Sequence, residues 1–321
     1  MRMRRWIAGC LCLLFVAASV LSANGQPQPL KVAILLPGPY NDHGWNEVGY
    51  SGLMAIKEHV GAQVAYTENV QQSDEAADFR GYAAQGYTLV FGHGFQFADA
   101  AKQVAPEFPH TWFVVTSTVA GQAPNVASMS VDNYQQGYLA GAAAALLSKT
   151  GIVGTVGGQP IPPITNALKG FEAGAKHVNP AVQVLSGFTE SFSDVAKAKE
   201  FALAMIDKGA DVVMGDANQA GIGVVGAARD RHVLAIGMNS DQHSLAPETI
   251  PISVIQNYAA GFVAVAKKVL DGSLQPGPLN AGLNEGAVYP SPWYGPIPDQ
   301  VQRSFQDVLD QAKAGQLPRP R

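Results

Sequence analysis

The chain has 321 residues, of which 47% are hydrophobic and 14% are charged, and its formal net charge is −4. This composition excludes an intrinsically disordered chain and is typical of one or two globular domains with a well-buried core. The acidic balance disfavours nucleic acid or an anionic membrane surface as a partner.

The first 25 residues have the pattern of a secretory signal peptide. A basic start, MRMRR, precedes the apolar stretch WIAGCLCLLFVAASVL, and Ala23 and Gly25 occupy the −3 and −1 positions of a cleavage site. A retained membrane anchor is the competing interpretation, but the apolar stretch is short for a span. We therefore expect residues 1–25 to be removed and the mature chain to lie in the periplasm.

Both cysteines, Cys10 and Cys12, lie within this segment. The mature chain would therefore contain no disulfide and no cysteine metal site. The stretch IAGC, which ends at Cys10, resembles a lipid-attachment signal, but almost no hydrophobic region precedes it. A lipoprotein is therefore the less favoured alternative.

Short apolar runs alternate with helical patterns along the remainder of the chain. Their continuous apolar character favours strands that are covered on both faces, and the alternation predicts parallel sheets wound by right-handed crossovers. The strand-like runs are 30–36, 63–68, 87–93, 111–117, 151–157, 182–188, 210–216 and 232–238. The helical patterns are 45–59, 73–85, 97–105, 133–149, 164–178, 194–208, 218–230, 258–271 and 299–315.

The runs form two sets of ordinary domain size, with no flexible linker between them. Residues 125–141 lead directly from a strand into a helix, and two further extended pieces, 250–258 and 283–295, follow the second set. We therefore predict an α/β fold of two doubly wound Rossmann-like lobes joined by a three-segment hinge, which creates a cleft that can close. The expected N-terminal lobe comprises 26–130 plus 257–284, and the expected C-terminal lobe comprises 131–256 plus 285–321.

Amides, carboxylates and aromatic rings follow the predicted strands. Ligands of doubly wound sheets bind beyond the carboxyl ends of the strands, so these side chains are the candidate ligand-binding residues. Their lack of cationic character favours a neutral, planar or polyhydroxyl ligand that is stacked on rings and hydrogen-bonded by amides. The candidates are Asn41, Asp42, Trp45, Asn46, His93, Gly94, Phe95, Ser117, Asp132, Phe192, Asp216, Asn218, Asn239 and Gln256.

Each candidate also has a structural interpretation that remains open. Asn41 and Asp42 could cap the helix that begins near Gly44, and Trp45 could be a core residue. Asp132 could pair with a hinge amide. A single histidine in a loop, such as His93, is more often structural than catalytic.

No catalytic or cofactor motif is present in the expected mature chain. It lacks a G-x-S-x-G elbow, an H-E-x-x-H pair and a cysteine nucleophile, and the histidines show no metal-ligand spacing. A phosphate-binding G-x-x-x-x-G-K-[ST] loop is also missing. We therefore expect no enzyme activity, no cofactor and no metal.

Several stretches resemble the basic membrane protein family of solute-binding proteins for ABC transporters. They include NDHGWNEVGYSGL, VAPEFPHTWFVVTS, QQGYLAGAAAALLSKTGIVGTVGGQPIPP and AIGMNSDQ, and together they span most of the expected mature chain. The resemblance implies a type I periplasmic binding protein that binds a purine base or nucleoside. It also implies a membrane permease as the partner, and we expect a monomer.

The resemblance assigns roles to particular residues. Trp45 and the polar residues around it fill the places of the family's first ligand-binding loop. Asp132 or Asn133 fits the hinge residue that reads the base, and Phe192 in TESFSD fits the ring that stacks on the purine.

Two positions depart from the nucleoside-binding pattern. Asn239 replaces an Asp that holds the ribose hydroxyls, and Gln256 stands where a Lys usually faces the ribose. Exchanging both members of an opposite-charge pair for amides keeps the site neutral but weakens its hydrogen bonds at the ribose end. We therefore favour a free purine base over a nucleoside. The alternatives are a sugar or another small polar ligand, a periplasmic sensor protein, and a nucleoside hydrolase with clustered Asp residues.

Overall fold

The computed structural model describes residues 29–42 and 44–318. The expected signal peptide lies outside the described residues. Within the described ranges, no helix has the length and apolar character needed to cross a membrane.

The first lobe is built on a six-stranded parallel sheet in the order β11-β5-β4-β3-β1-β2. Alternate residues of β3 lie on opposite faces of this sheet. Phe91 belongs to the hydrophobic core that contains residues of α1 and α8, whereas Val90 belongs to the core that contains residues of α2 and α3. The strands are β1 (Lys31–Leu35), β2 (Gln63–Thr67), β3 (Leu89–Gly92), β4 (Trp112–Thr116), β5 (Val126–Val131) and β11 (Gly277–Ala281). The helices are α1 (Trp45–Val60), α2 (Glu75–Ala84), α3 (Ala98–Val104) and α8 (Tyr258–Leu270), with short turns η1 (Phe95–Phe97) and η2 (Ala105–Glu107).

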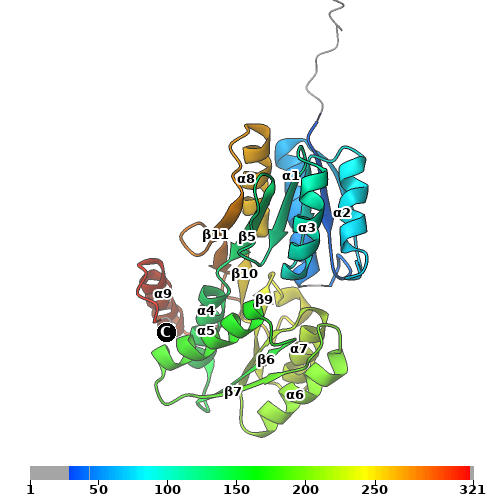
Figure 1. Cartoon of the computed structure of the whole chain (residues 1–321). Coiled ribbons are helices and arrows are strands. Elements are labelled where there is room, and N and C mark those ends of the chain that lie inside the picture. The colour runs from blue at the N-terminus through cyan, green and yellow to red at the C-terminus, as the bar shows by residue number, and fades with distance from the viewer. Residues whose placement is uncertain (1–28, 43, 319–321) are drawn as a thin grey trace, which may run out of the picture.

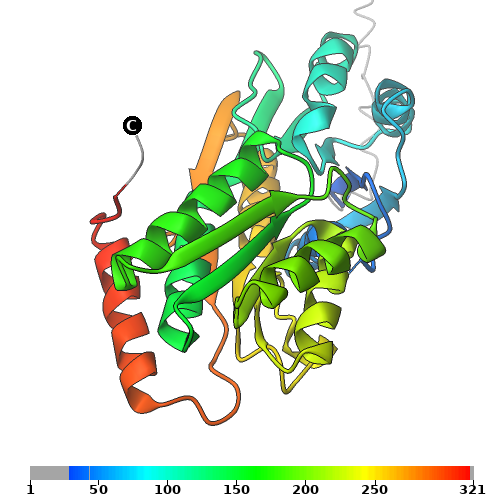
Figure 2. The same cartoon turned by 90° about the horizontal axis from the view of Figure 1, so that it is seen from below.

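The second lobe is built on a sheet in the order β12-β10-β9-β8-β6-β7, in which only β12 is antiparallel among the described strands. Helices α6 and α7 cover one face, and α4, α5 and α9 lie on the other (Figures 1 and 2). The strands are β6 (Ile152–Gly157), β7 (Gln183–Phe188), β8 (Val212–Asp216), β9 (Leu234–Asn239), β10 (Ile252–Gln256) and β12 (Val288–Pro290). The helices are α4 (Asn133–Leu147), α5 (Pro162–Val178), α6 (Val195–Asp207), α7 (Gly221–Asp230) and α9 (Asp299–Lys313), with turns η3 (Asn218–Ala220) and η4 (His243–Leu245).

The chain passes between the two sheets three times: from β5 into α4, from β10 into α8, and from β11 towards β12. Figure 1 shows the lobes stacked with these segments side by side between them. The predicted two-lobed α/β class with a three-segment hinge is therefore confirmed. The exact lobe boundaries stay a prediction.

The strand β11 was not expected from the sequence. Its residues, GPLNA, lack the apolar run that marks the other parallel strands, and Pro278 has no backbone N–H. The strand lies at the edge of the sheet, where it pairs only with β5 among the described strands. An edge position tolerates a proline because one side of the strand needs no ladder hydrogen bonds.

Helices α4 and α5 pack with their backbones almost in contact, because both carry glycines at the crossing. A Cβ atom added to Gly141 would lie 1.9 Å from the carbonyl oxygen of Phe171, and one added to Gly174 would lie 1.9 Å from that of Tyr138. No side chain fits at these positions unless the helices separate. The close approach therefore fixes α4, which leads out of the first hinge crossing, against the second lobe.

We predict that Gly141→Ala lowers the free energy of unfolding by about 2–3 kcal/mol, because the added methyl group forces a packed backbone apart. The matched control is Gly226→Ala in α7, where an added Cβ meets no atom within 4 Å. That control should stabilise the protein by up to about 1 kcal/mol through helix propensity. Urea denaturation of both variants measures the effects, and equal unfolding free energies would contradict the prediction.

Candidate ligand-binding site

A cavity of about 640 Å³ lies between the lobes, at the carboxyl ends of the strands of both sheets. Most of the residues expected at the site line it: Asp42, Trp45, Asn46, Gly94, Phe95, Ser117, Phe192, Asp216, Asn218, Asn239 and Gln256. No Lys or Arg is among the described residues of its lining. The lobes also touch at its edge, since a Cβ atom added to Gly44 would lie 3.4 Å from Cα of Asn218.

Asp42 acts as the cap of α1. One oxygen of its buried carboxylate accepts from the backbone N–H groups of Gly44 and Glu47, at 3.0 and 3.1 Å. The other accepts from the backbone and side-chain amides of Asn46, at 3.1 and 2.7 Å. The amide oxygen of Asn46 in turn accepts from Gly38 N–H. These bonds satisfy the N–H groups of the first turn of α1, so the capping interpretation of Asp42 holds although the residue also lines the cavity.

The Trp45 ring lines the cavity, and its orientation is fixed because it stacks on the His93 ring. The two rings stack at 4.0 Å between centroids, with 13° between their planes. Trp45 Nε1–H donates to the backbone carbonyl of His93, and His93 Nε2 bonds the carbonyl of Trp45 at 2.9 Å. Tyr258 meets Trp45 edge-on at 5.2 Å.

His93 itself does not line the cavity, although it was expected among the ligand-binding residues. Its side chain is fully buried, and Nδ1 bonds Thr116 Oγ1 at 3.1 Å. Burial lowers the pKa of His93 to about 3, since water is not available to solvate the charged ring, and the bond to the Trp45 carbonyl opposes this only in part. The ring is therefore neutral at physiological pH.

Phe192 supplies an aromatic wall from the second lobe. Its ring lies over Gly158 so closely that a Cβ atom added to Gly158 would be 2.4 Å from it. The backbone carbonyl of Phe192 accepts from Ala220 N–H at the start of α7. Phe192 and Trp45 thus face the same cavity from different lobes, as a stacking arrangement requires.

A chain of buried amides forms the wall beside the hinge, and its centre is Gln136 in α4. Gln136 Nε2 donates to the backbone carbonyl of Val254 and to Asn239 Oδ1, both at 3.0 Å. Gln256 Nε2 donates to Gln136 Oε1 at 2.5 Å, and Asn239 Nδ2 donates to Asp216 Oδ1 at 3.2 Å. Gln136 was not predicted from the sequence, because it lies inside a helix and not at the end of a strand.

The wall beside the hinge leaves two acceptors unused. Gln256 Oε1 is buried without a hydrogen-bond partner among the described residues, and the second oxygen of Asp216 also bonds to none of them. Burial raises the pKa of Asp216 to about 6, and its bond from Asn239 opposes the shift. Both unused acceptors belong to residues that line the cavity.

Glu75 and Asp99 line the cavity from the first lobe and were also missed. Glu75 is the first residue of α2 and is only 4% exposed, yet its side chain bonds to no described residue. Burial and the nearby Asp99 carboxylate raise the pKa of Glu75 to about 7. No pattern in the sequence indicates this corner of the cavity, because acidic residues in a first helical turn are ordinary.

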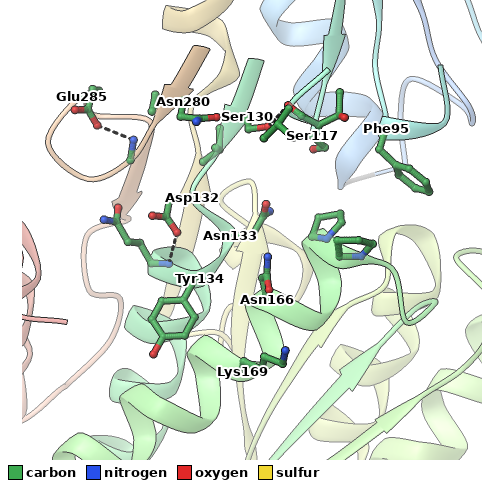
Figure 3. A pocket seen from close by; sticks show the side chains of 18 of the residues that line it. Phe95, Ser117, Ser130, Asp132, Asn133, Tyr134, Asn166, Lys169, Asn280 and Glu285 are labelled. Carbon is green, nitrogen blue, oxygen red and sulfur yellow. Dashed lines mark hydrogen bonds between the residues drawn. The ribbon is translucent and has the colours of Figure 1, made fainter. Parts of the chain in front are cut away.

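Two other expected residues lie outside this cavity. Asn41 is exposed on the loop before α1 and does not line it. Asp132 caps α4 by accepting from Gln135 N–H at 3.0 Å, and it lines a separate groove of about 900 Å³ on the hinge flank (Figure 3). Asn133, one residue later, lines both spaces. Of the two alternatives for the residue that reads the ligand, only Asn133 lines the cavity between the lobes, and the choice between them stays a prediction.

The described residues contain no group of three or more His, Cys, Asp or Glu side chains that could hold a metal ion. The cavity instead combines aromatic rings, amides and carboxylates. Such a site can bind a flat ligand by stacking and by accepting its N–H groups.

Residues 30–311 match the family described as Bmp, ABC transporter substrate-binding protein PnrA-like. A nucleoside-binding protein of an ABC transporter from Lactococcus lactis is 31% identical over 88% of this chain and 87% of its own. A purine-binding protein of Brucella abortus is 30% identical over 90% of this chain and 83% of its own. The transcriptional activator protein med of Bacillus subtilis is 29% identical over 96% and 98%.

Solved structures show the same fold. A transcriptional activator of the comK gene from Bacillus halodurans superposes with a TM-score of 0.80, at 27% identity, over 90% of this chain and 100% of its own. An ABC transporter solute-binding protein from Conexibacter woesei superposes with a TM-score of 0.76, at 26% identity, over 91% and 98%.

We predict that His93 makes the protein less stable in acid. Between pH 6.5 and about 3 the unfolded chain binds a proton at His93 that the folded chain does not, so stability falls as pH falls through this range. The stability of the wild type relative to His93→Gln should therefore decrease by about 2 kcal/mol from pH 7 to pH 5. Chemical denaturation of both proteins at the two pH values measures this, and a constant difference would refute a buried neutral His93.

Proposed function

The chain belongs to the Bmp family of ABC transporter substrate-binding proteins, and we propose that its interlobe cavity binds a purine, with the free base preferred over the nucleoside. The family consists of solute-binding proteins, which confirms the expectation of a binding protein instead of an enzyme. The observation that carries the proposal is a cavity with aromatic rings on both lobes, Trp45 and Phe192, and buried amides on the wall beside the hinge.

The preference for a free base rests on the two positions that depart from the nucleoside-binding pattern. Asn239 and Gln256 are uncharged amides that both bond to Gln136, in a network that Asn239 extends to the Asp216 carboxylate. Each of these amides has one acceptor oxygen, whereas a carboxylate has two, and neither amide can donate a charge-assisted hydrogen bond as a lysine does. Ribose hydroxyls would therefore form only uncharged hydrogen bonds with these two amides, which are weaker than charge-assisted ones.

The proposed mechanism is closure of the two lobes around the ligand. The ligand stabilises the closed form through contacts that only this form provides, and the closed protein then docks on a membrane permease. We propose that this takes place in the periplasm, after removal of residues 1–25, and that the protein acts as a monomer.

A sensory role is the second candidate, because one relative is named a transcriptional activator. The same cavity would then report the ligand to a receptor instead of delivering it to a permease. Uptake of a radiolabelled purine in cells with and without this gene distinguishes the two. Unchanged uptake together with changed gene expression would favour the sensor.

Isothermal titration calorimetry with purine bases, their nucleosides and simple sugars tests the proposed ligand class. We expect the bases to bind more tightly than the nucleosides, and Trp45→Ala to weaken binding at least about 10-fold through lost stacking. Trp112→Phe is the control, since Trp112 begins β4 and does not line the cavity. Tight binding of nucleosides or sugars with no binding of any base would overturn the proposal.

We further predict that Asn239→Asp and Gln256→Lys restore nucleoside binding only when they are combined. Alone, the first places a second carboxylate beside Asp216, whose oxygen lies 3.2 Å from the Asn239 amide, and the second buries an unpaired ammonium group. Together they offer charge-assisted bonds of about 1.5–3 kcal/mol each, so nucleoside affinity should rise at least about 10-fold over the wild type. Calorimetry of all three variants measures this, and additive single effects would count against a coupled pair.

A further inference from the structure

The corner of the cavity formed by Glu75 and Asp99 differs from the rest of the site, because its carboxylates have no protein partner. Neither side chain takes part in an ion pair or hydrogen bond with any residue the structure describes. By contrast, four N–H groups surround the carboxylate of Asp42 on the same lobe. Buried polar groups are normally paired, so an unpaired carboxylate in a binding cavity implies a partner on the ligand.

The wall beside the hinge imposes the same requirement independently. The donor of Gln136 must face the Val254 carbonyl, and this bond sets the direction of the entire amide chain. Gln256 therefore turns its nitrogen towards Gln136 and leaves Oε1 buried and unpaired. The unused polar atoms of Glu75, Asp99 and Gln256 are thus all acceptors, and no Lys or Arg among the described lining residues can pair with them.

From this geometry we propose that Glu75, assisted by Asp99, is a subsite for an amino group of the ligand, so that amino-substituted heterocycles are selected over their oxo counterparts. The inference rests on the proposed function in one respect, namely that the ligand occupies the interlobe cavity. An exocyclic –NH₂ donates to the carboxylate. A carbonyl oxygen at the same place is itself an acceptor and cannot donate to the carboxylate. The carboxylate would then stay unpaired, and a hydrogen-bonding site strongly rejects a ligand of this kind.

The charged side chains among the described residues that line the cavity are all acidic. Asp99 approaches from α3, while Asp42 before α1 and Asp216 at the end of β8 lie on other walls of the same cavity. Glu75 titrates close to neutral pH, so an amino ligand that binds its charged form displaces a proton from part of the population. Its affinity should therefore rise with pH up to about 7 and then level off.

The test compares two matched pairs, adenine with hypoxanthine and cytosine with uracil, by calorimetry at pH 8. Within each pair an amino group is exchanged for an oxygen on the same ring. We expect the amino member of at least one pair to bind about 100-fold more tightly or better. In Glu75→Gln this ratio should fall to about 3-fold or less, because an amide can turn to offer a donor or an acceptor.

Asp78→Asn is the matched control, since Asp78 lies on the same helix α2 but does not line the cavity. It should keep the full discrimination. Titration of the amino ligand at pH 7 in two buffers of different ionisation enthalpy gives a second readout. The wild type should release roughly half a proton on binding, and Glu75→Gln should release clearly less.

The outcomes separate the two proposals. Equal affinities within both pairs, or undiminished discrimination in Glu75→Gln, would overturn the amino subsite while leaving the purine proposal intact. Discrimination between cytosine and uracil without any purine binding would support the subsite and overturn the purine assignment. Failure of all four compounds to bind would overturn both.

Discussion

The hydrogen bond from Gln136 Nε2 to the backbone carbonyl of Val254 determines the chemistry of the cavity wall beside the hinge. A backbone carbonyl can only accept, so this bond removes the ambiguity of the Gln136 amide and, through it, of Asn239 and Gln256. Gln136 lies one turn into α4, just beyond the first hinge crossing, and Val254 lies in β10, just before the second. The bond therefore joins two hinge segments and at the same time sets which groups the ligand meets.

The two aromatic walls are held in a different way. The Trp45 ring is fixed by stacking on His93 and by the bonds that link the two residues, whereas the Phe192 ring depends on the missing side chain of Gly158. Neither ring needs to reorganise when a flat ligand enters between them. Preorganisation of this kind lowers the entropic cost of binding, so more of the contact energy appears as affinity.

The sequence predicted the fold well because buried parallel strands and amphipathic helices leave direct periodic signals. It failed at β11, whose short Gly-Pro start resembles a loop and whose pairing with β5 depends on contacts 150 residues apart. At the site, position after a strand identified Trp45 and Asn239 correctly as cavity residues but could not show that His93 faces inward. Gln136 and Glu75 escaped because they lie in helices, whereas the sequence pattern pointed to residues at the ends of strands.

The contact between Gly44 and Asn218 joins the two lobes at the edge of the cavity, so in the proposed mechanism a bound molecule is released when the lobes separate. Residence time is then governed by the frequency of this opening, and affinity and release become partly independent quantities. A membrane protein that binds both lobes and separates them would release the ligand without competing for any contact between the ligand and the cavity. A glycine at position 44 would make this contact between the lobes easy to break, because a residue without a side chain contacts the opposite lobe through backbone atoms alone.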